Sequence, residues 1–399
     1  MKNRIANRMT TISPSLTLAI SAKAKAMKAA GESVVSFGVG EPDFNTPDRI
    51  INAAKVALDD GQTKYTPSSG LLPLRKAICE KFKKDNGLDY EPSQIIVSNG
   101  AKHSIFNACF AVLEPGDEVI IPAPYWLTYP EVVKVCGATP VYIDCKKENK
   151  FKFTAEDLKK AITPKTKMLI FNSPSNPTGA VYDEAEVRAI AKVCEDAEIF
   201  VLADEIYEKL CYNGVKAFSI AKCSEKMKDL TITINGVSKT YAMTGWRVGY
   251  LAAPKDVAKA IDSFQSHATS NACSISQYAT IEALQCSDEE IQAMVDVFDA
   301  RRAKLLKLIS EIDGVQAVEP DGAFYVMLVV GGVYGKKCGD KEITDSVSFA
   351  DALLEAEKVA TVPGVSFGAP DCVRLSYALS ESDIEEGLKR IKRFVENLQ

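Results

Sequence analysis

The middle of this 399-residue chain alternates short apolar segments with segments of helical periodicity. Helical spacing of apolar residues appears at 101–113 and 183–196. The strand-like apolar segments are residues 95–98, 118–121, 167–171, 199–203 and 230–234. Strands that alternate with helices form a mostly parallel sheet, because each parallel connection needs a crossover that covers a face of the sheet. The pattern therefore predicts an α/β fold whose mostly parallel sheet is sandwiched by helices.

The pattern changes near residue 290, and a chain of this length exceeds one compact core. The later segments are a long helix at 291–312, a strand at 323–330, a glycine-rich loop at 331–339, a helix at 347–358, a strand at 373–377 and a closing helix from 383 onward. The chain begins with an arm and a helix at 16–30. We predict a large domain at 46–290 and a smaller α+β domain made of 1–45 and 291–399.

Composition excludes several classes of function. The net charge is −5 with no long basic run, which argues against nucleic acid or an anionic membrane as a partner. No apolar run approaches the ~18 residues of a membrane span, and the first six residues lack the apolar core of a signal peptide. The 11 cysteines are scattered and the histidines number two, so we expect a reduced, cytoplasmic protein without a metal site.

Ligands of open parallel sheets bind at the carboxyl ends of the strands, so the residues after each strand carry the functional prediction. Asn99-Gly100-Ala101-Lys102 follows the first strand and opens a helix. A helix N-terminus presents free N–H groups that suit a phosphate, although many helices begin after glycine. Trp126 follows the second strand between stiffening prolines. Its ring suits stacking on a planar cofactor, and packing in the core is the ordinary alternative.

The third and fourth strands end in polar residues. Asn176 lies between prolines after the third strand, where its amide suits a phenolate oxygen, or simply forms a turn. Asp204 ends the fourth strand, and a buried carboxylate is costly without a partner. A protonated pyridine nitrogen is such a partner, and pairing makes the ring an electron sink. Tyr207 follows three positions later, within reach of a ring hydroxyl.

Lys239 follows the fifth strand, and Arg247 comes eight positions later. Burial at a strand end lowers the pKa of a lysine and makes it nucleophilic, whereas most loop lysines are solvated. A lysine nucleophile beside a cation for phosphate is what pyridoxal 5'-phosphate (PLP) requires. The preceding strand ends supply a phosphate cradle, a stacking ring, an amide and an acid. We therefore predict that Lys239 binds PLP covalently.

At these residues the sequence resembles the class I and II aminotransferases, the fold-type I PLP enzymes. The segments that carry the resemblance are GVGEPDF at 38–44, YTP at 65–67, NSPSNPTG at 172–179, DEIY at 204–207, SKTYAMTGWR at 238–247, GAFY at 322–325 and VRLS at 373–376. They span nearly the whole chain. The resemblance implies a large PLP-binding domain with a sheet of the seven-stranded type, and a smaller domain built from both ends of the chain.

The resemblance also assigns roles around the cofactor. It implies that Lys239, Asp204 and Tyr207 are catalytic. The residues that it implies for PLP binding are Tyr65, Gly100, Ala101, Lys102, Trp126, Asn176, Asp204, Tyr207, Ser238, Lys239 and Arg247. Among them, Tyr65 reaches the phosphate of the neighbouring subunit in this family, so a homodimer is implied. Many relatives have serine three positions before the lysine as a phosphate ligand, where this chain has Gly236, so the resemblance does not supply that contact.

For substrate, the chain is similar to the bacterial aspartate aminotransferase subgroup that also contains aspartate/prephenate aminotransferases. The residues implied for substrate are Gly40, Thr17, Lys102, Trp126, Asn176 and Arg374. Arg374 corresponds to the clamp for the α-carboxylate, and without the family match a surface arginine would explain it equally well. Thr17 and Lys102 correspond to residues that bind the distal carboxylate. A lysine in the first turn of a helix is disfavoured by the dipole, which favours a functional role over a solvated one.

We therefore predict PLP-dependent transamination between an acidic amino acid and an oxo acid, aspartate or glutamate with 2-oxoglutarate or oxaloacetate, and prephenate as a further candidate. The alternatives are a broad-specificity aromatic or alanine aminotransferase and a PLP-dependent lyase, because the fold does not fix the reaction. A regulator with an aminotransferase-like domain would need a DNA-binding module, and the chain shows no basic face for one.

Overall fold

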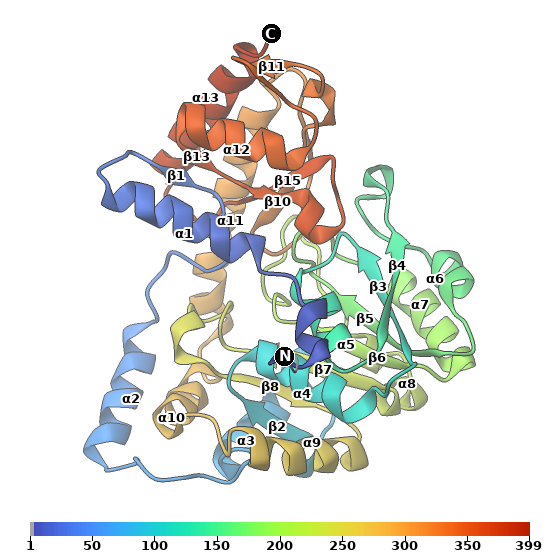
Figure 1. Cartoon of the computed structure of the whole chain (residues 1–399). Helices are drawn as coiled ribbons and strands as arrows, with labels where there is room; N and C mark the ends of the chain where they lie inside the picture. The colour runs from blue at the N-terminus through green and yellow to red at the C-terminus, as the bar shows by residue number, and fades with distance from the viewer. Residues whose placement is uncertain (1–3) are drawn as a thin grey trace.

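The computed structural model describes residues 4–399, and its largest sheet has seven strands in the order β2-β8-β7-β6-β5-β3-β4 (Figure 1). The bounds are β2 Ile95–Ser98, β3 Glu118–Ala123, β4 Thr139–Asp144, β5 Thr166–Asn172, β6 Phe200–Asp204, β7 Thr231–Gly236 and β8 Gly249–Ala252. Neighbouring strands are parallel except at β8, which runs antiparallel to β2 and β7. The predicted mostly parallel α/β sheet is confirmed, and β4 and β8 are strands that the sequence pattern did not locate.

Helices cover both faces of this sheet, and the six that form its two main apolar layers lie three on each side. They are α4 Ala101–Val112, α5 Thr128–Val135 and α9 Lys255–Ala268 on one face, and α6 Ala155–Ala161, α7 Glu184–Ala197 and α8 Glu225–Asp229 on the other. Along β5, Met168 and Ile170 pack with the first group, whereas Leu169 and Phe171 pack with the second. Burial on both faces explains why residues 168–171 of this strand are all apolar instead of alternating.

Side-chain caps set where the long helices begin. Asp183 accepts a hydrogen bond from the backbone N–H of Glu186, and the Glu186 side chain accepts one from the N–H of Asp183. This capping box satisfies N–H groups that the helix itself leaves free. Ser287 and Glu290 form the same motif at the start of α11, which spans Asp288–Ile309. Because of this cap, α11 begins three residues earlier than the apolar spacing predicts.

A second sheet, antiparallel and four-stranded, has the order β14-β15-β10-β9. Its strands are β9 Gln316–Val318, β10 Tyr325–Val329, β14 Val362–Pro363 and β15 Cys372–Ser376. Helix α12 Ser346–Glu357 packs beside it, and α13 Glu381–Glu396 packs on α12 and α11. Figure 1 shows the N-terminal helix α1, Leu16–Ala29, near these C-terminal elements. A parallel pair of β1 Val35–Ser36 and β13 Val359–Ala360 joins the two ends of the chain.

The remaining described elements are short strands, three helices and single turns. The predicted glycine-rich loop contains a small hairpin of β11 Lys337–Cys338 and β12 Lys341–Glu342. Helix α10 Ser274–Ala283 packs on both α2 Asp48–Asp59 and α3 Leu72–Lys81. A 3-10 turn at Asn7–Thr11 lies on α5. Within residues 4–399, no helix is long and apolar enough to cross a membrane.

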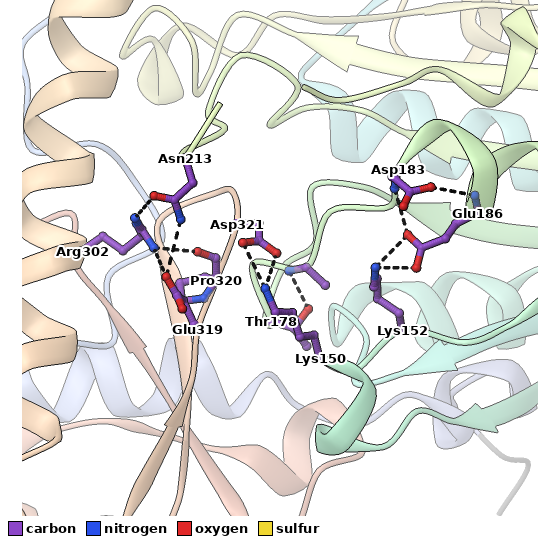
Figure 2. Close-up of polar contacts among 11 residues, drawn as sticks. Lys150, Lys152, Thr178, Asp183, Glu186, Asn213, Arg302, Glu319, Pro320 and Asp321 are labelled. Atoms are coloured by element: carbon purple, nitrogen blue, oxygen red, sulfur yellow. Dashed lines mark hydrogen bonds and ion pairs between the residues drawn. The ribbon is translucent and has the colours of Figure 1, made fainter. Parts of the chain in front are cut away.

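Polar contacts hold the segment before β10 against loops of the larger sheet (Figure 2). Arg302 on α11 donates to the Asn213 side chain, with 2.9 Å between Nη2 and Oδ1. Lys150 forms an ion pair with Asp321, 2.9 Å from Nζ to Oδ2. The backbone N–H of Asp321 donates to the carbonyl of Gly179 at 2.9 Å. These contacts fix the loop that ends at Gly179 next to the strand that carries part of the site described below.

Candidate active site

A cavity of about 520 Å³ lies at the carboxyl ends of β5, β6 and β7. Loops after the strands of the large sheet, the first turn of α4, the start of α1 and the strands β10 and β15 line it. The predicted site residues that line this cavity are Thr17, Gly40, Ala101, Lys102, Trp126, Asn176, Asp204, Tyr207, Ser238, Lys239, Arg247 and Arg374. Residues from distant parts of the chain therefore meet where the parallel topology predicts a site.

Lys239 extends from the loop after β7 into this cavity. Its Nζ donates a hydrogen bond to the carbonyl oxygen of Gly40. The ammonium lies 5.7 Å from the ring centre of Tyr207 and 5.6 Å from that of Phe324. The amine is thus held by aromatic walls and one backbone acceptor, without a carboxylate in direct contact among the described residues.

The electrostatics around Lys239 favour the neutral amine. Burial lowers its pKa from 10.5 to about 8, and the cations Arg374 and Arg247 lower it further, against the opposing charges of Glu41 and Asp204. A lysine with this pKa is a nucleophile and a proton acceptor near neutral pH.

We therefore predict that Lys239 is the most reactive lysine of the ligand-free protein near pH 8. About half of its amines are neutral there, against roughly one in three hundred for a lysine of ordinary pKa. Competitive acetylation across a pH series, read by peptide mass spectrometry, should give a midpoint near 8 for Lys239. A midpoint near 10.5, the ordinary value for lysine, would contradict the burial argument.

Asp204 ends β6 and lies buried at the cavity wall, 3% exposed. Its carboxylate accepts a hydrogen bond from the hydroxyl of Tyr129, 2.7 Å away, and one from the backbone N–H of Ile206 at 3.2 Å. Burial raises the pKa of Asp204 to about 6, and these hydrogen bonds limit the rise. The group is therefore a carboxylate at neutral pH, ready to pair with a cationic ring nitrogen.

Tyr129 is a site residue that the sequence prediction missed. It lies three residues after Trp126, at the start of α5, and the two rings meet edge to face with centres 5.4 Å apart. Its hydroxyl is buried against Asp204. The helical spacing from Trp126 is the sequence signal that would have placed Tyr129 on the same side of the site.

Tyr325, at the start of β10, is a second missed residue. Its hydroxyl lies 3.0 Å from that of Tyr207, and its ring lies under the guanidinium of Arg374 at 4.4 Å. The strand register places Tyr325 opposite Ser376, two residues from Arg374. Tyr325 therefore fixes the orientations of two predicted site residues at once. Its place in the GAFY segment at 322–325 is the sequence signal that could have identified Tyr325 as a site residue.

Arg374 lies on β15, an interior strand of the second sheet, and is 2% exposed. Its Nη1 donates to the side-chain oxygen of Asn176 at 3.0 Å, and its Nη2 donates to the carbonyl of Gly38 at 3.2 Å. Burial lowers its pKa. Its Nε has no partner, and no carboxylate of residues 4–399 pairs with it. A buried, unpaired guanidinium is costly, so this arrangement favours binding of an external carboxylate.

The start of α4 has a geometry that suits an anion. Gly100 has φ of +90°, and a Cβ at this position would come within 2.5 Å of Nη2 of Arg247. Glycine therefore lets the guanidinium approach the helix N-terminus, where the first N–H groups lack partners within the helix. Arg247 is held by the carbonyl of Thr244 at 2.8 Å, and no carboxylate in the described chain pairs with it. N–H groups without a partner in the helix, placed beside a cation, suit a phosphate.

Lys102 and Thr17 lie on another part of the cavity wall. The Lys102 ammonium lies 4.8 Å from the ring centre of Trp126. Burial and the nearby Arg247 lower its pKa, and within residues 4–399 it has no carboxylate partner. The hydroxyl of Thr17 is buried and also without a hydrogen-bond partner in that range. An ammonium and a hydroxyl without protein partners suit an anionic or polar ligand.

Comparison with known proteins decides the family. The sequence profile of the aminotransferase class I and II family matches residues 32–391. The chain belongs to this family. The aminotransferase is 50% identical to the aspartate aminotransferase of Bacillus subtilis, over 98% of this chain and 99% of that protein. It is 45% identical to a probable aspartate/prephenate aminotransferase of Aquifex aeolicus over the full length of both. The crystal structure of the aspartate aminotransferase from Rhizobium meliloti matches with a TM-score of 0.96 at 43% identity, covering all of both chains.

Aminotransferases of this family use PLP, and the residues of this aminotransferase fit the cofactor. A phosphate needs free N–H donors and a cation, which the start of α4 and Arg247 provide. A pyridine nitrogen needs a buried acid, which Asp204 provides. An aldehyde needs a neutral amine, and Lys239 has the lowered pKa for it. Within the described range, no cluster of three or more side chains suits a metal ion.

Two predicted positions of the aminotransferase need separate comment. Tyr65 is 91% exposed and lines a separate surface pocket with Ser270 and Asn271. Within one chain, its side chain therefore does not reach the cavity that contains Lys239. Its contact with a neighbouring subunit stays a prediction. At Gly236, a Cβ would lie 3.1 Å from Cα of Gly249, which leaves little room for the serine of other relatives. Ser238 and Thr244 are the hydroxyl-bearing residues of this loop that line the cavity.

Proposed function

We propose that this enzyme transaminates a dicarboxylic amino acid, aspartate or glutamate, with 2-oxoglutarate or oxaloacetate, and that prephenate is a further substrate. One observation carries the proposal: the cavity holds two unpaired cations besides the phosphate-site arginine, Arg374 and Lys102. Every amino acid has the α-carboxylate that suits Arg374. A second cation is useful only when the substrate has a second anionic group. The names of the relatives, aspartate and aspartate/prephenate aminotransferases, support the same substrates.

The proposed cofactor contacts follow from the same geometry. Arg247, the start of α4 and Ser238 would hold the phosphate, and Trp126 would stack on the ring. Asn176 and Tyr207 would bind the phenolic oxygen, and Asp204 would pair with the ring nitrogen. The Asn176 amide supports this role, because its oxygen faces Arg374 and leaves the NH₂ group free to donate. The bound cofactor supplies a ring that accepts electrons and stabilises negative charge at the substrate Cα.

The protein's own residues perform the proton transfers and the positioning. Lys239 Nζ, whose pKa is lowered to about 8, would hold the cofactor until the amine of the substrate displaces it; the released lysine amine then accepts the Cα proton and returns it as an acid. Arg374 and Lys102 orient the two carboxylates so that the Cα–H bond meets this amine. Thr17 brings the N-terminal segment to the distal carboxylate. Charge pairing at these remote groups also favours exclusion of water from the cavity.

Replacing Lys102 with methionine tests the substrate class. A charged, desolvated hydrogen bond contributes ~1.5–3 kcal/mol, so kcat/KM for aspartate and glutamate should fall roughly ten- to two-hundred-fold. Alanine and phenylalanine, which have one carboxylate, should be affected much less. A panel of amino donors with 2-oxoglutarate or oxaloacetate, read as oxo acid formed, gives all of these values.

The matched control is Arg374→Lys, which should weaken every donor because the α-carboxylate is common to all. If Lys102→Met lowers both donor classes equally, Lys102 serves the phosphate or the fold. A broad-specificity aminotransferase would then be the better description. Loss of amino donor without transfer to the oxo acid would instead indicate a lyase.

We further propose a large domain at 46–290 and a smaller one made of 1–45 and 291–399. The complete seven-stranded sheet within 46–290 and the β1–β13 pair support this division. We propose a homodimer in which Tyr65, exposed in the single chain, reaches the neighbouring cofactor. We also propose a reducing, cytoplasmic compartment, in keeping with 11 cysteines that are all free.

A further inference from the structure

The turn after β6 has a second polar side that faces away from the cavity. Asp204 and Tyr207 line the cavity, whereas Glu205 and Glu208, between and beside them, do not. Glu205 is 6% exposed, and the Glu208 side chain is equally buried. Two buried carboxyl groups directly behind the catalytic turn are costly unless their partners are well placed.

Glu208 has such partners. Its carboxylate forms an ion pair with Lys81, a residue of α3 that is 8% exposed. The Asn86 side chain bridges the pair: its Nδ2 donates to Glu208 Oε2 at 2.8 Å, and its Oδ1 accepts from Lys81 at 2.8 Å. Burial opposes ionisation of Glu208, but Lys81 and the amides lower its pKa below the ordinary value. Glu205 next to it has its pKa raised to about 8 by burial and by Glu208, so it stays neutral.

Asn235 connects this buried pair to the loop that carries Lys239. It lies on β7, is 2% exposed, and uses both ends of its amide. Its Nδ2 donates to Glu208 Oε1 at 2.8 Å, and its Oδ1 accepts the backbone N–H of Gly236 at 2.7 Å. Lys239 follows Gly236 by three residues. The amide therefore links the turn behind Tyr207 to the strand end from which the reactive lysine extends.

We propose that Asn235 is a positioning residue for transamination, which fixes the Lys239 loop relative to the Asp204–Tyr207 turn through the anchored carboxylate of Glu208. The proposal rests on the function proposed above for Lys239. Replacing a buried ion pair with apolar residues often leaves stability unchanged or improves it, so fold stability alone does not account for the pair. Its position between two catalytic segments accounts for it, since misplacement of a reacting group by about 1 Å costs up to ~10²-fold in rate.

The consequence is measurable on Lys239 itself. Without the amide, the loop is free to move the amine outward, away from the buried surroundings and the cations that lower its pKa. The pKa of Lys239 then rises toward the ordinary value of 10.5. At the same time kcat falls about tenfold while KM stays within about threefold, because the carboxylate clamps are untouched.

The experiment compares Asn235→Ala and Glu208→Gln with a matched control, Glu186→Gln. Glu186 also accepts from a lysine, with Lys152 Nζ 2.5 Å and 2.7 Å from its two oxygens, and from the backbone N–H of Asp183, but it lies on α7 outside the cavity (Figure 2). Each apoenzyme is acetylated competitively across a pH series, and the Lys239 peptide gives its pKa. Steady-state kinetics of the PLP-loaded enzymes and thermal denaturation complete the comparison.

We expect Asn235→Ala and Glu208→Gln to raise the pKa of Lys239 by about one unit and to lower kcat about tenfold, and Glu186→Gln to change neither. An unchanged Lys239 pKa in a folded Asn235→Ala protein overturns the proposal, as does an equal shift in the control. If Asn235→Ala does not fold, the pKa of Lys239 in Glu208→Gln tests the proposal instead, because that substitution keeps the size of the side chain. Failure of the proposed function is distinguishable: borohydride reduction would then place PLP on another lysine, whatever the pKa shift.

Discussion

Replacing Lys239 with alanine is expected to lower turnover by at least about 10⁴-fold. The variant lacks both the amine that attaches PLP and the group that moves the Cα proton, and acid–base catalysis alone contributes ~10²–10⁴-fold. No other lysine replaces it, because Lys102, the other lysine that lines the cavity, lies against Trp126. Turnover of aspartate with 2-oxoglutarate measures the loss.

The parent enzyme provides the complementary measurement. Borohydride reduction should fix PLP on Lys239, which peptide mapping identifies. Lys259→Ala, an exposed lysine on α9, serves as the control and should keep full activity. Reduced label on any lysine other than Lys239 would refute the assignment.

Replacing Asp204 with asparagine should lower turnover by at least about 10²-fold. This minimum is the lower end of the range that acid–base catalysis contributes to enzyme rates. Asparagine keeps the size and still accepts the hydrogen bond of Tyr129, but it cannot balance a protonated ring nitrogen. The pH profile gives a second check. Asp204 takes up a proton as the pH falls through its pKa, about 6 without ligand and lower when paired with a cation. The parent should therefore lose activity on the acid side at or below pH 6, and this limb should be absent in Asp204→Asn.

Tyr129→Phe separates the charge of Asp204 from its hydrogen bonding. The substitution removes one donor but keeps the carboxylate, so the pKa of Asp204 should rise and turnover should fall about tenfold or less. Near-normal turnover in Asp204→Asn would show that Asp204 is not the partner of the ring nitrogen. A larger loss in Tyr129→Phe than in Asp204→Asn would assign the main role to the tyrosine.

The sequence predicted the position of the site because topology alone brings strand ends together. Asn176, Asp204 and Lys239 each follow an apolar segment long enough to identify as a strand, and parallel strands place their carboxyl ends at one edge. Lys102 and Arg374 also line the cavity. The strand β8 escaped prediction because four residues of mixed character give no period, and β4 because its apolar residues are interrupted by Pro140 and the exposed Tyr142.

Contacts between distant segments set the rest of the site, and local patterns do not contain them. Tyr325 meets Tyr207 only because the start of β10 lies against the turn after β6. Lys81 and Glu208 are far apart in the sequence, and each alone resembles a solvated charge on a helix or turn. Burial turns them into a fixed pair, and burial depends on the whole fold.

The unpaired cations of the cavity also limit how far this protein can be stabilised. Arg247 repels Lys102, and Arg247 and Arg374 both repel the ammonium form of Lys239, so the ligand-free fold carries electrostatic strain that bound anions relieve. A carboxylate introduced beside any of them would strengthen the empty protein while competing with the ligands. At this site, higher thermal stability and higher affinity for anions therefore oppose each other. Stabilising substitutions that keep ligand binding lie elsewhere in the fold.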